Sequence, residues 1–381
     1  MASGSIIVSD RRARFHASPL RHVDPLLLGA PIALAGLGLL MVYSSTHRKL
    51  QEAGLDPYDF VKRQGIAIAV GIVAMLVLTA IDYRRLRELA FLGYAATVLM
   101  LVAVLRVGAN VKGAQARFDI GPFQLQPGEF AKLFLILVLA GYCAQHRDGM
   151  TARRLVVALA ICAVPMGLIM LQPDLGTNLV LMASAFTILM VAGVRARQLI
   201  VLLLLAFTLA VVSVQAGVLD QYQLDRLTSF ANLGTNADRS GYNQTQSETA
   251  VANGGFTGQG LFGGSQTNGQ YVPEQHTDFI FTVVGEELGF VGGAIVIGLF
   301  GIIVWRILRA ARLAQDTFGT LCCMGVLGMF VAQMFENIGM AMGIMPVTGI
   351  PLPFMSYGGS SIIVSFACIG LVANVRMRRF S

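Results

Sequence analysis

Apolar runs long enough to cross a lipid bilayer recur along almost the whole of this chain. A transmembrane helix needs about 20 consecutive apolar residues. Runs of this kind lie at about residues 25–45, 64–81, 88–106, 128–145, 154–171, 176–193, 198–217, 279–305, 318–343 and 358–375. Of the 381 residues 55% are hydrophobic and 13% are charged, a charged share roughly half that of soluble proteins. We therefore predict an all-α polytopic membrane protein with ten transmembrane helices.

Basic residues occupy the short segments between these runs. If the N-terminus lies in the cytoplasm and the runs alternate in direction, each of the six inner segments carries two to four arginines. Such an excess on the inner side is the positive-inside pattern of membrane proteins. We therefore predict cytoplasmic termini. We attribute the net charge of +7 to membrane topology and not to nucleic-acid binding.

The sequence predicts a single domain. A cytoplasmic N-terminal tail, 1–24, precedes one ten-helix membrane domain, 25–375, and a short cytoplasmic tail, 376–381, follows it. The largest extracytoplasmic loop, 218–277 between helices 7 and 8, is rich in Gly, Asn, Gln and Ser. Loops of this length are usually functional. The glycines at 258–263 predict local flexibility.

Ionisable residues gather near the outer ends of the predicted helices, where they are costly and usually functional. Lys112, Gln115 and Arg117 lie in the second outer loop, and Glu129 and Lys132 open the helix that follows. Glu129 and Lys132 are three residues apart and can form an ion pair on one helix face. The same residues can instead form a cationic patch for a phosphate-bearing substrate, and both interpretations stay open.

Three further carboxylates are predicted at the same boundary. Asp174 follows Pro173 at the start of a helix, where an aspartate can cap the helix or face a substrate cavity. His276 and Asp278 end the long loop, and we expect Asp278 in the first turn of the next helix. Glu286 is about two turns further on, so we expect both carboxylates to face one cavity.

The segment before the last run contains several prolines. Three of them between residues 346 and 353 rule out a regular helix. Irregular backbone at membrane depth is tolerated where it is buried in protein or lines a cavity. The hydroxyl groups of Ser356, Tyr357 and Ser360 can therefore contact a ligand or satisfy the backbone.

In this order, these segments resemble the SEDS family of bacterial cell-wall proteins, which includes RodA, FtsW and SpoVE. The resemblance covers about residues 25–379, and the run 346–353 is more similar to RodA than to FtsW. The residues that carry it include Lys112-Gly-Ala-Gln115, Gln126-Pro127, Glu129-Phe-Ala-Lys132, Gln172-Pro-Asp174-Leu-Gly-Thr177, His276-Thr-Asp278, Glu286-Glu-Leu-Gly289, Asn337-Ile-Gly-Met340 and Ser356-Tyr-Gly-Gly-Ser-Ser361.

The resemblance implies a peptidoglycan glycosyltransferase of the bacterial inner membrane, with its active site on the extracytoplasmic side. Such an enzyme polymerises lipid II for cell-wall elongation and cell shape, by an inverting transfer in which undecaprenyl pyrophosphate leaves. The implied partners are a class B penicillin-binding protein and other cell-wall elongation proteins. The alternatives are an FtsW-like division polymerase and a lipid II flippase. A flippase needs ionisable groups near the middle of the membrane, for which Glu336 is the main candidate.

The resemblance also assigns roles to residues. Asp278 is the implied catalytic base. Lys112, Arg117 and Lys132 are candidate contacts of the pyrophosphate. The full substrate-binding set that we expect is Lys112, Gln115, Arg117, Glu129, Lys132, Asp174, His276, Glu286, Ser356, Tyr357 and Ser360. A divalent cation (Mg or Mn) can serve as a cofactor, although the spacing of the potential ligands predicts no dedicated metal site.

Overall fold

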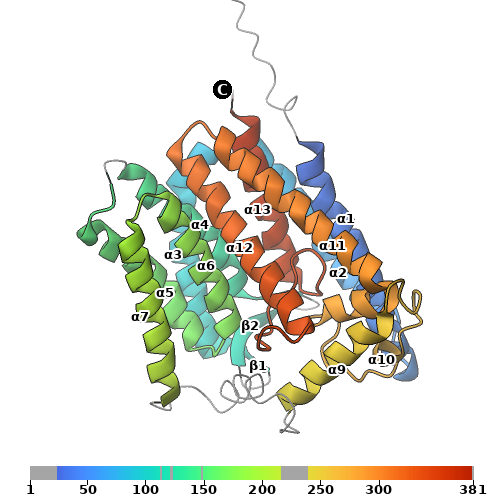
Figure 1. Cartoon of the computed structure of the whole chain (residues 1–381). Helices are drawn as coiled ribbons and strands as arrows, with labels where there is room; N and C mark the ends of the chain where they lie inside the picture. The colour runs from blue at the N-terminus through green and yellow to red at the C-terminus, as the bar shows by residue number, and fades with distance from the viewer. Residues whose placement is uncertain (1–23, 112–113, 121–122, 147–148, 216–238, 380–381) are drawn as a thin grey trace, which may run out of the picture.

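The computed structural model describes residues 24–111, 114–120, 123–146, 149–215 and 239–379. Most of these residues are helical (Figure 1). The helices are α1 (Pro25–Glu52), α2 (Asp59–Ala80), α3 (Tyr83–Val107), α4 (Pro127–Gln145), α5 (Ala152–Met170), α6 (Leu175–Val191), α7 (Ala196–Gln215), α9 (Arg239–Gly254), α10 (Ser265–Asn268), α11 (Ile280–Leu313), α12 (Thr317–Ala341) and α13 (Gly359–Met377). Each predicted apolar run overlaps one of these helices, so the helical fold class is confirmed.

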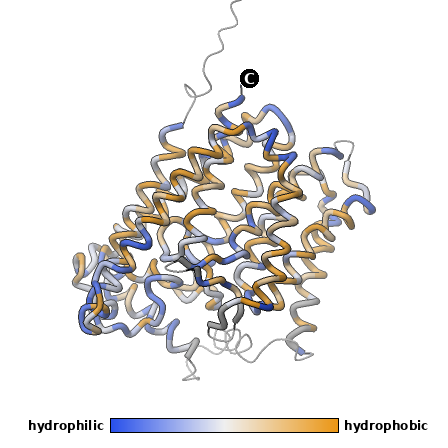
Figure 2. Tube along the Cα trace, turned by 180° about the vertical axis from the view of Figure 1, so that it is seen from behind, coloured by the Kyte–Doolittle hydropathy of each residue, from blue (hydrophilic) through white to orange (hydrophobic). Residues whose placement is uncertain are grey.

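Apolar composition makes most of these helices candidates for membrane spans. Eight described helices are long and apolar enough to cross a bilayer, and α6 and an apolar part of α7 are shorter. Figure 2 shows hydrophobic residues along the bundle and hydrophilic residues mainly at its two ends. The start of α1 and the end of α13 lie at one end, and α9, α10 and the strands lie at the other (Figure 1).

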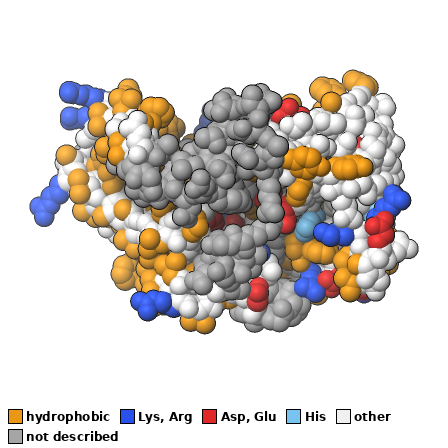
Figure 3. Space-filling model, turned by 90° about the horizontal axis from the view of Figure 1, so that it is seen from below, with side chains coloured by type: hydrophobic (Ala, Val, Ile, Leu, Met, Phe, Trp, Pro, Cys, Tyr) orange, Lys and Arg blue, Asp and Glu red, His pale blue; other side chains and the backbone are white. Residues whose placement is uncertain are grey.

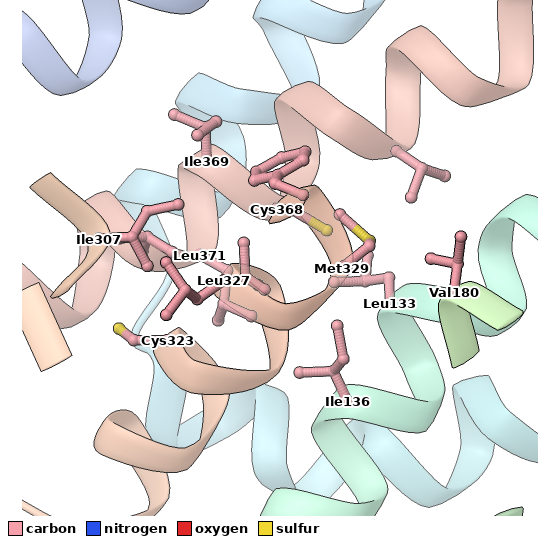
Figure 4. Close-up of a cluster of buried hydrophobic side chains, with 14 of the residues drawn as sticks. Leu133, Ile136, Val180, Ile307, Cys323, Leu327, Met329, Cys368, Ile369 and Leu371 are labelled. Atoms are coloured by element: carbon pink, nitrogen blue, oxygen red, sulfur yellow. The ribbon is translucent and has the colours of Figure 1, made fainter. Parts of the chain in front are cut away.

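The centre of the bundle is formed by α13. In its apolar window 94% of the residues are buried, against 22% in α3. Its neighbours include α2, α4 and α12. Figure 4 shows Cys368 of α13, Met329 of α12 and Leu133 of α4 in one cluster of buried side chains. Close packing of this kind fixes the positions of the helix ends that surround the site described below.

A small sheet occupies the loop before α4, where the sequence predicted no regular structure. Strands β1 (Ala109–Val111), β2 (Ala114–Ile120) and β3 (Phe123–Leu125) pair antiparallel in the order β1-β2-β3. The third strand leads directly into α4, whose first residue is Pro127. Pro127 suits the first position of a helix, and the predicted run at about 128–145 is confirmed as this helix. Arg117 belongs to β2, at the end of the bundle opposite the start of α1 (Figure 1).

A break in α11 binds the last part of the long loop. Gly289 has φ 64° and ψ −159°, a conformation that essentially only glycine adopts. The helical hydrogen bonds lost there are replaced by the loop: the Gln259 amide donates to the Glu286 carbonyl, and the Phe290 amide donates to the Gly255 carbonyl. The glycines predicted as a flexible loop are instead packed against this break.

A buried ion cluster joins three helices at the opposite end. Asp24, the N-cap of α1, accepts from Arg306 of α11 at 2.9 Å and also pairs with Arg376 of α13. All three residues are at most 9% exposed. The sequence indicated Arg306 and Arg376 only as basic residues of the inner surface. The structure shows that they also hold α1, α11 and α13 together.

Candidate active site

A polar cavity of about 530 Å³ opens at the end of the bundle that carries the sheet. Its walls come from α2, the sheet, α4, the turn before α6, the turn before α11 and the segment between α12 and α13. Figure 3 views this end and shows acidic, basic and histidine side chains gathered there. Segments far apart in the sequence thus form one site, as their polar residues suggested.

Eight of the predicted site residues line this cavity: Arg117, Glu129, Lys132, Asp174, His276, Asp278, Tyr357 and Ser360. Lys112 lies outside the described residues, and so does the side chain of Gln115. Glu286 and Ser356 are described but do not line the cavity.

Glu129 and Lys132 form the predicted ion pair. Their carboxylate and ammonium groups are 2.7 Å apart, and the side chains are only 4% and 2% exposed. Both belong to the first turns of α4, and both face the cavity. The pair neutralises two charges that would be costly to bury alone. It also leaves the ammonium group beside the cavity.

Asp174 both caps a helix and lines the cavity, so the two interpretations of this residue coexist. One of its oxygens accepts from the Thr177 amide at 2.9 Å, which makes it the N-cap of α6. The other accepts from the Thr177 hydroxyl at 2.7 Å and from the Gln126 side chain at 3.3 Å. Asp174 thereby ties the start of α6 to the start of α4.

Ser360 and Tyr357 line the wall in front of α13. The Ser360 hydroxyl accepts from the Gln126 amide at 3.1 Å and donates to the Gln124 carbonyl at 2.9 Å. Ser360 therefore joins α13 to the strand that leads into α4. Burial raises the pKa of the Tyr357 phenol above its usual value, so the phenol is neutral and can donate a hydrogen bond at neutral pH.

Asp278 lies in a turn just before α11. The helix begins at Ile280, so the prediction that Asp278 belongs to its first turn is wrong by two residues. The Asp278 amide donates to the Glu274 carbonyl at 3.1 Å. Its half-buried side chain lines the cavity. His276 packs its ring against Phe60 at 4.9 Å between ring centroids, which fixes the turn against α2.

The Glu286 carboxylate does not face the cavity, so the prediction that it shares the cavity with Asp278 is wrong. Its carboxylate accepts from the amides of Gln266 at 2.7 Å and Thr267 at 2.9 Å, and from the Thr267 hydroxyl at 2.7 Å. The side chain is fully buried by these contacts. Helical spacing does not relate it to Asp278, because regular helix starts only at Ile280. Glu286 therefore anchors α10 and does not contribute to the cavity.

Ser356 does not line the cavity either, contrary to the prediction that it belongs to the substrate-binding set. Its hydroxyl accepts from the Leu352 amide at 2.8 Å, and the residue is 1% exposed. It satisfies the backbone of the proline-rich segment, which is one of the two roles left open by the sequence.

Several polar residues of the cavity were missed by the sequence analysis. Arg63 lines it from α2 and forms a 3.0 Å ion pair with Asp59. Gln64, which is 1% exposed, donates to the carbonyl groups of Met355 and Ser356. Both follow the connection between the first two apolar runs, where the second run starts. The sequence feature that could have identified them is a charged residue followed by a glutamine at the start of an otherwise apolar run.

The chemistry of the cavity combines carboxylates with cations. Asp278 supplies a carboxylate that can accept a proton. Arg117 and Lys132 supply positive charge that can stabilise an anionic group of a bound molecule. The Arg117 guanidinium donates to the Gln124 side chain at 2.9 Å. Among the residues that the structure describes, no three His, Cys, Asp or Glu side chains come together in a way that could hold a metal ion.

Comparison with known proteins identifies this architecture. The chain matches the cell cycle protein family FTSW_RODA_SPOVE over residues 25–380. Stage V sporulation protein E of Bacillus subtilis is 36% identical over 356 residues, which cover 92% of this chain and 96% of that protein. A probable peptidoglycan glycosyltransferase FtsW of Trichlorobacter lovleyi is 37% identical over 363 residues, which cover 93% of each protein.

Solved structures agree with this result. A chain of a peptidoglycan synthase complex, solved for the structural coordination of polymerization and crosslinking, is 33% identical to this chain. Its TM-score is 0.79, and the match covers 94% of this chain and 99% of that one. RodA of Thermus thermophilus is 32% identical, with a TM-score of 0.71 and coverage of 94% and 98%. Proteins named FtsW, SpoVE and RodA are thus similarly related to this chain, which belongs to the FtsW, RodA and SpoVE family, the SEDS family.

Proposed function

We propose that this protein is a peptidoglycan glycosyltransferase that polymerises lipid II into glycan strands. The observation that carries the proposal is the half-buried Asp278 in a cavity that also contains Lys132 and Arg117. The printed names of related proteins, peptidoglycan glycosyltransferase among them, support the reaction class. Since the run 346–353 is similar to RodA, we further propose a role in cell-wall elongation and cell shape.

The proposed reaction joins two lipid-linked disaccharides. The 4-hydroxyl oxygen of the acceptor sugar attacks the anomeric carbon of the donor, and the carbon–oxygen bond to the pyrophosphate breaks. The electron pair of that bond leaves with undecaprenyl pyrophosphate, and the hydroxyl proton passes to Asp278 as general base. Direct displacement at the anomeric carbon inverts its configuration. Arg117 and Lys132 would stabilise the charge that develops on the leaving group.

The remaining cavity residues are proposed to bind and orient the substrate. Lys112 and Gln115 belong to the same outer loop as Arg117 and complete the proposed set on that side. Glu129, Asp174, His276, Tyr357 and Ser360 line the cavity and offer acceptors and donors to sugar hydroxyls. Mg²⁺ is commonly held by one or two carboxylates together with substrate phosphates. A divalent cation (Mg or Mn) bound with the pyrophosphate would supply further positive charge at the leaving group.

The position of Glu336 argues for an enzyme over a lipid II flippase. A flippase needs ionisable groups in the middle of the membrane. Glu336 is 1% exposed and lies near the outer end of α12, beside Thr348 of the cavity wall. The main candidate for a mid-membrane group therefore belongs to the surroundings of the same outer site.

We propose ten membrane crossings with both termini in the cytoplasm and the cavity outside. Alternation of the helices and the arginine-rich segments support this orientation. Asn253 and Arg153 are exposed at opposite ends of the bundle, and all five native cysteines are buried. In intact cells a membrane-impermeant thiol reagent should label Asn253→Cys, and should label Arg153→Cys only after lysis. The reverse pattern would place the cavity in the cytoplasm and refute the proposed site.

We also propose that the protein works with a class B penicillin-binding protein, and with further proteins of cell-wall elongation. This proposed partnership is supported by the similar chain that was solved within a peptidoglycan synthase complex. The purified chain should convert lipid II into glycan strands slowly by itself and several-fold faster with its partner, as measured by gel analysis of labelled lipid II. Equal rates with and without each candidate partner would contradict the partnership. No product under any condition would contradict the proposed reaction.

A further inference from the structure

Asn337 of α12 makes two hydrogen bonds that converge on the cavity wall. Its side-chain nitrogen donates to the Asp278 carbonyl and to the Ile350 carbonyl, each at 2.7 Å. The residue has no exposed surface. An amide nitrogen has two hydrogens, and both are used here. Since both partners are carbonyl oxygens, the orientation of the side-chain amide is determined by its contacts.

These two bonds connect separate walls of the site. Asp278 belongs to the turn before α11, and Ile350 belongs to the proline-rich segment after α12, which also lines the cavity. Asn337 itself lies in a buried part of α12. One side chain of a rigid helix therefore sets the distance between the carboxylate-bearing turn and the opposite segment.

The turn that carries Asp278 needs such support because it lies outside regular helix. α11 begins only at Ile280, and its N-cap Phe279 makes no side-chain capping bond. Within the turn, Glu274 has a positive φ of 56°, which is uncommon for residues other than glycine. A backbone hydrogen bond from the Tyr357 amide to the His276 carbonyl, at 2.8 Å, also joins the turn to the segment before α13.

We propose that Asn337 is a positioning residue that holds the Asp278 carboxylate in its productive place. The inference rests on the proposed function, in which Asp278 is the base. Asn337 does not line the cavity and acts only through the backbone it binds. Because a misplacement of about 1 Å can reduce a rate about 100-fold, loss of this contact should affect turnover more than substrate binding.

The chain contains a matched control at its other end. Asn374 of α13 is also fully buried, and its side-chain nitrogen also donates to two backbone carbonyls, those of Leu78 and Ile81. Neither Asn374 nor its partners line the cavity. Substituting either asparagine by alanine removes two hydrogen bonds to backbone carbonyls, and Asn374→Ala also removes the one that the Asn374 side-chain oxygen accepts from Arg378 at 3.0 Å. Only Asn337→Ala removes them from the proposed active site.

The test compares Asn337→Ala and Asn337→Ser with Asn374→Ala in the purified full chain bound to its partner. We expect Asn337→Ala to lower kcat for lipid II polymerisation about 100-fold while KM changes less than about threefold. Asn337→Ser can donate one bond and should recover part of kcat. Asn374→Ala should leave kcat within about twofold of wild type, even where it lowers the unfolding temperature as much. Hydrogen exchange in residues 274–279 should rise only in the Asn337 variants.

Three results would overturn the inference. If wild type polymerises lipid II and Asn337→Ala retains the kcat of Asn374→Ala, Asn337 has no positioning role although the proposed function stands. If wild type with its partner produces no glycan strands, the proposed function fails and the inference fails with it. An unchanged exchange rate in residues 274–279 would contradict the tether independently of activity.

Discussion

Asp278→Asn is expected to abolish glycan polymerisation while leaving the protein folded. A general base contributes about 10²–10⁴-fold to a rate, and an amide cannot take the proton of the acceptor hydroxyl. The structural contacts of Asp278 given above use its backbone: the amide donates to the Glu274 carbonyl, and the carbonyl accepts from Asn337. Asparagine retains both. The measurement is the initial rate of lipid II polymerisation, together with the unfolding temperature and binding of the partner.

Glu274→Gln provides a matched control for this experiment. Glu274 lies in the same turn and also lines the cavity, but it is more exposed than Asp278. The substitution removes one negative charge from the same turn, so a general change in the electrostatic field of the cavity would lower the activity of both variants. We expect Glu274→Gln to retain most activity. Polymerisation by Asp278→Asn at a rate near that of wild type would refute the base assignment, and Asp174 would become the next candidate.

Lys132→Met is expected to have the second large effect, on both stability and activity. It leaves the Glu129 carboxylate buried without its ammonium partner, which is 2.7 Å away in a site at most 4% exposed. Removing one partner of a buried ion pair typically costs about 3–5 kcal/mol. Thermal unfolding in detergent should therefore show a marked loss of stability. Arg48→Met, which removes one partner of a largely exposed pair with Glu52, should have little effect.

The double variant Glu129→Gln, Lys132→Met separates the two interpretations of this pair. Replacing both charged groups by similar neutral ones removes the unpaired charge, so much of the lost stability should return. If Lys132 also stabilises the departing pyrophosphate, polymerisation should remain at least about 100-fold below wild type. A double variant with wild-type polymerisation would show that the pair is only structural. The cationic contacts would then have to come from Arg117, Arg63 or Lys112.

Features that depend on neighbouring residues could be predicted from the sequence. The helical fold class follows from apolar runs, since a helix satisfies its own backbone hydrogen bonds in lipid. The start of α4 at Pro127 follows from the fixed φ of proline. The Glu129–Lys132 pair follows from a spacing of three residues on one helix. Asp174 was recognised as a cap because it precedes α6 directly.

Features that depend on distant segments were decided by the tertiary structure. The helix that follows Asp278 begins two residues later than expected, and the Glu286 carboxylate is used by residues 265–267. Helical spacing therefore gave the wrong partner for Asp278, whose turn is held instead by Asn337 from α12. The sequence analysis named Asn337 only as part of a family motif and assigned no role to it.

The same distinction applies to charge. Counting arginines per segment predicts which end of each helix is cytoplasmic, because that pattern depends only on the order of residues along the chain. It did not indicate that Arg306 and Arg376 converge on Asp24 in a buried cluster. Residues some 280 to 350 positions away from Asp24 meet it only once the helices have packed. The sequence by itself thus determined the helices and the polar residues near one set of their ends. Packing decided which of these face one cavity, since long-range contacts depend on how the helices assemble around α13.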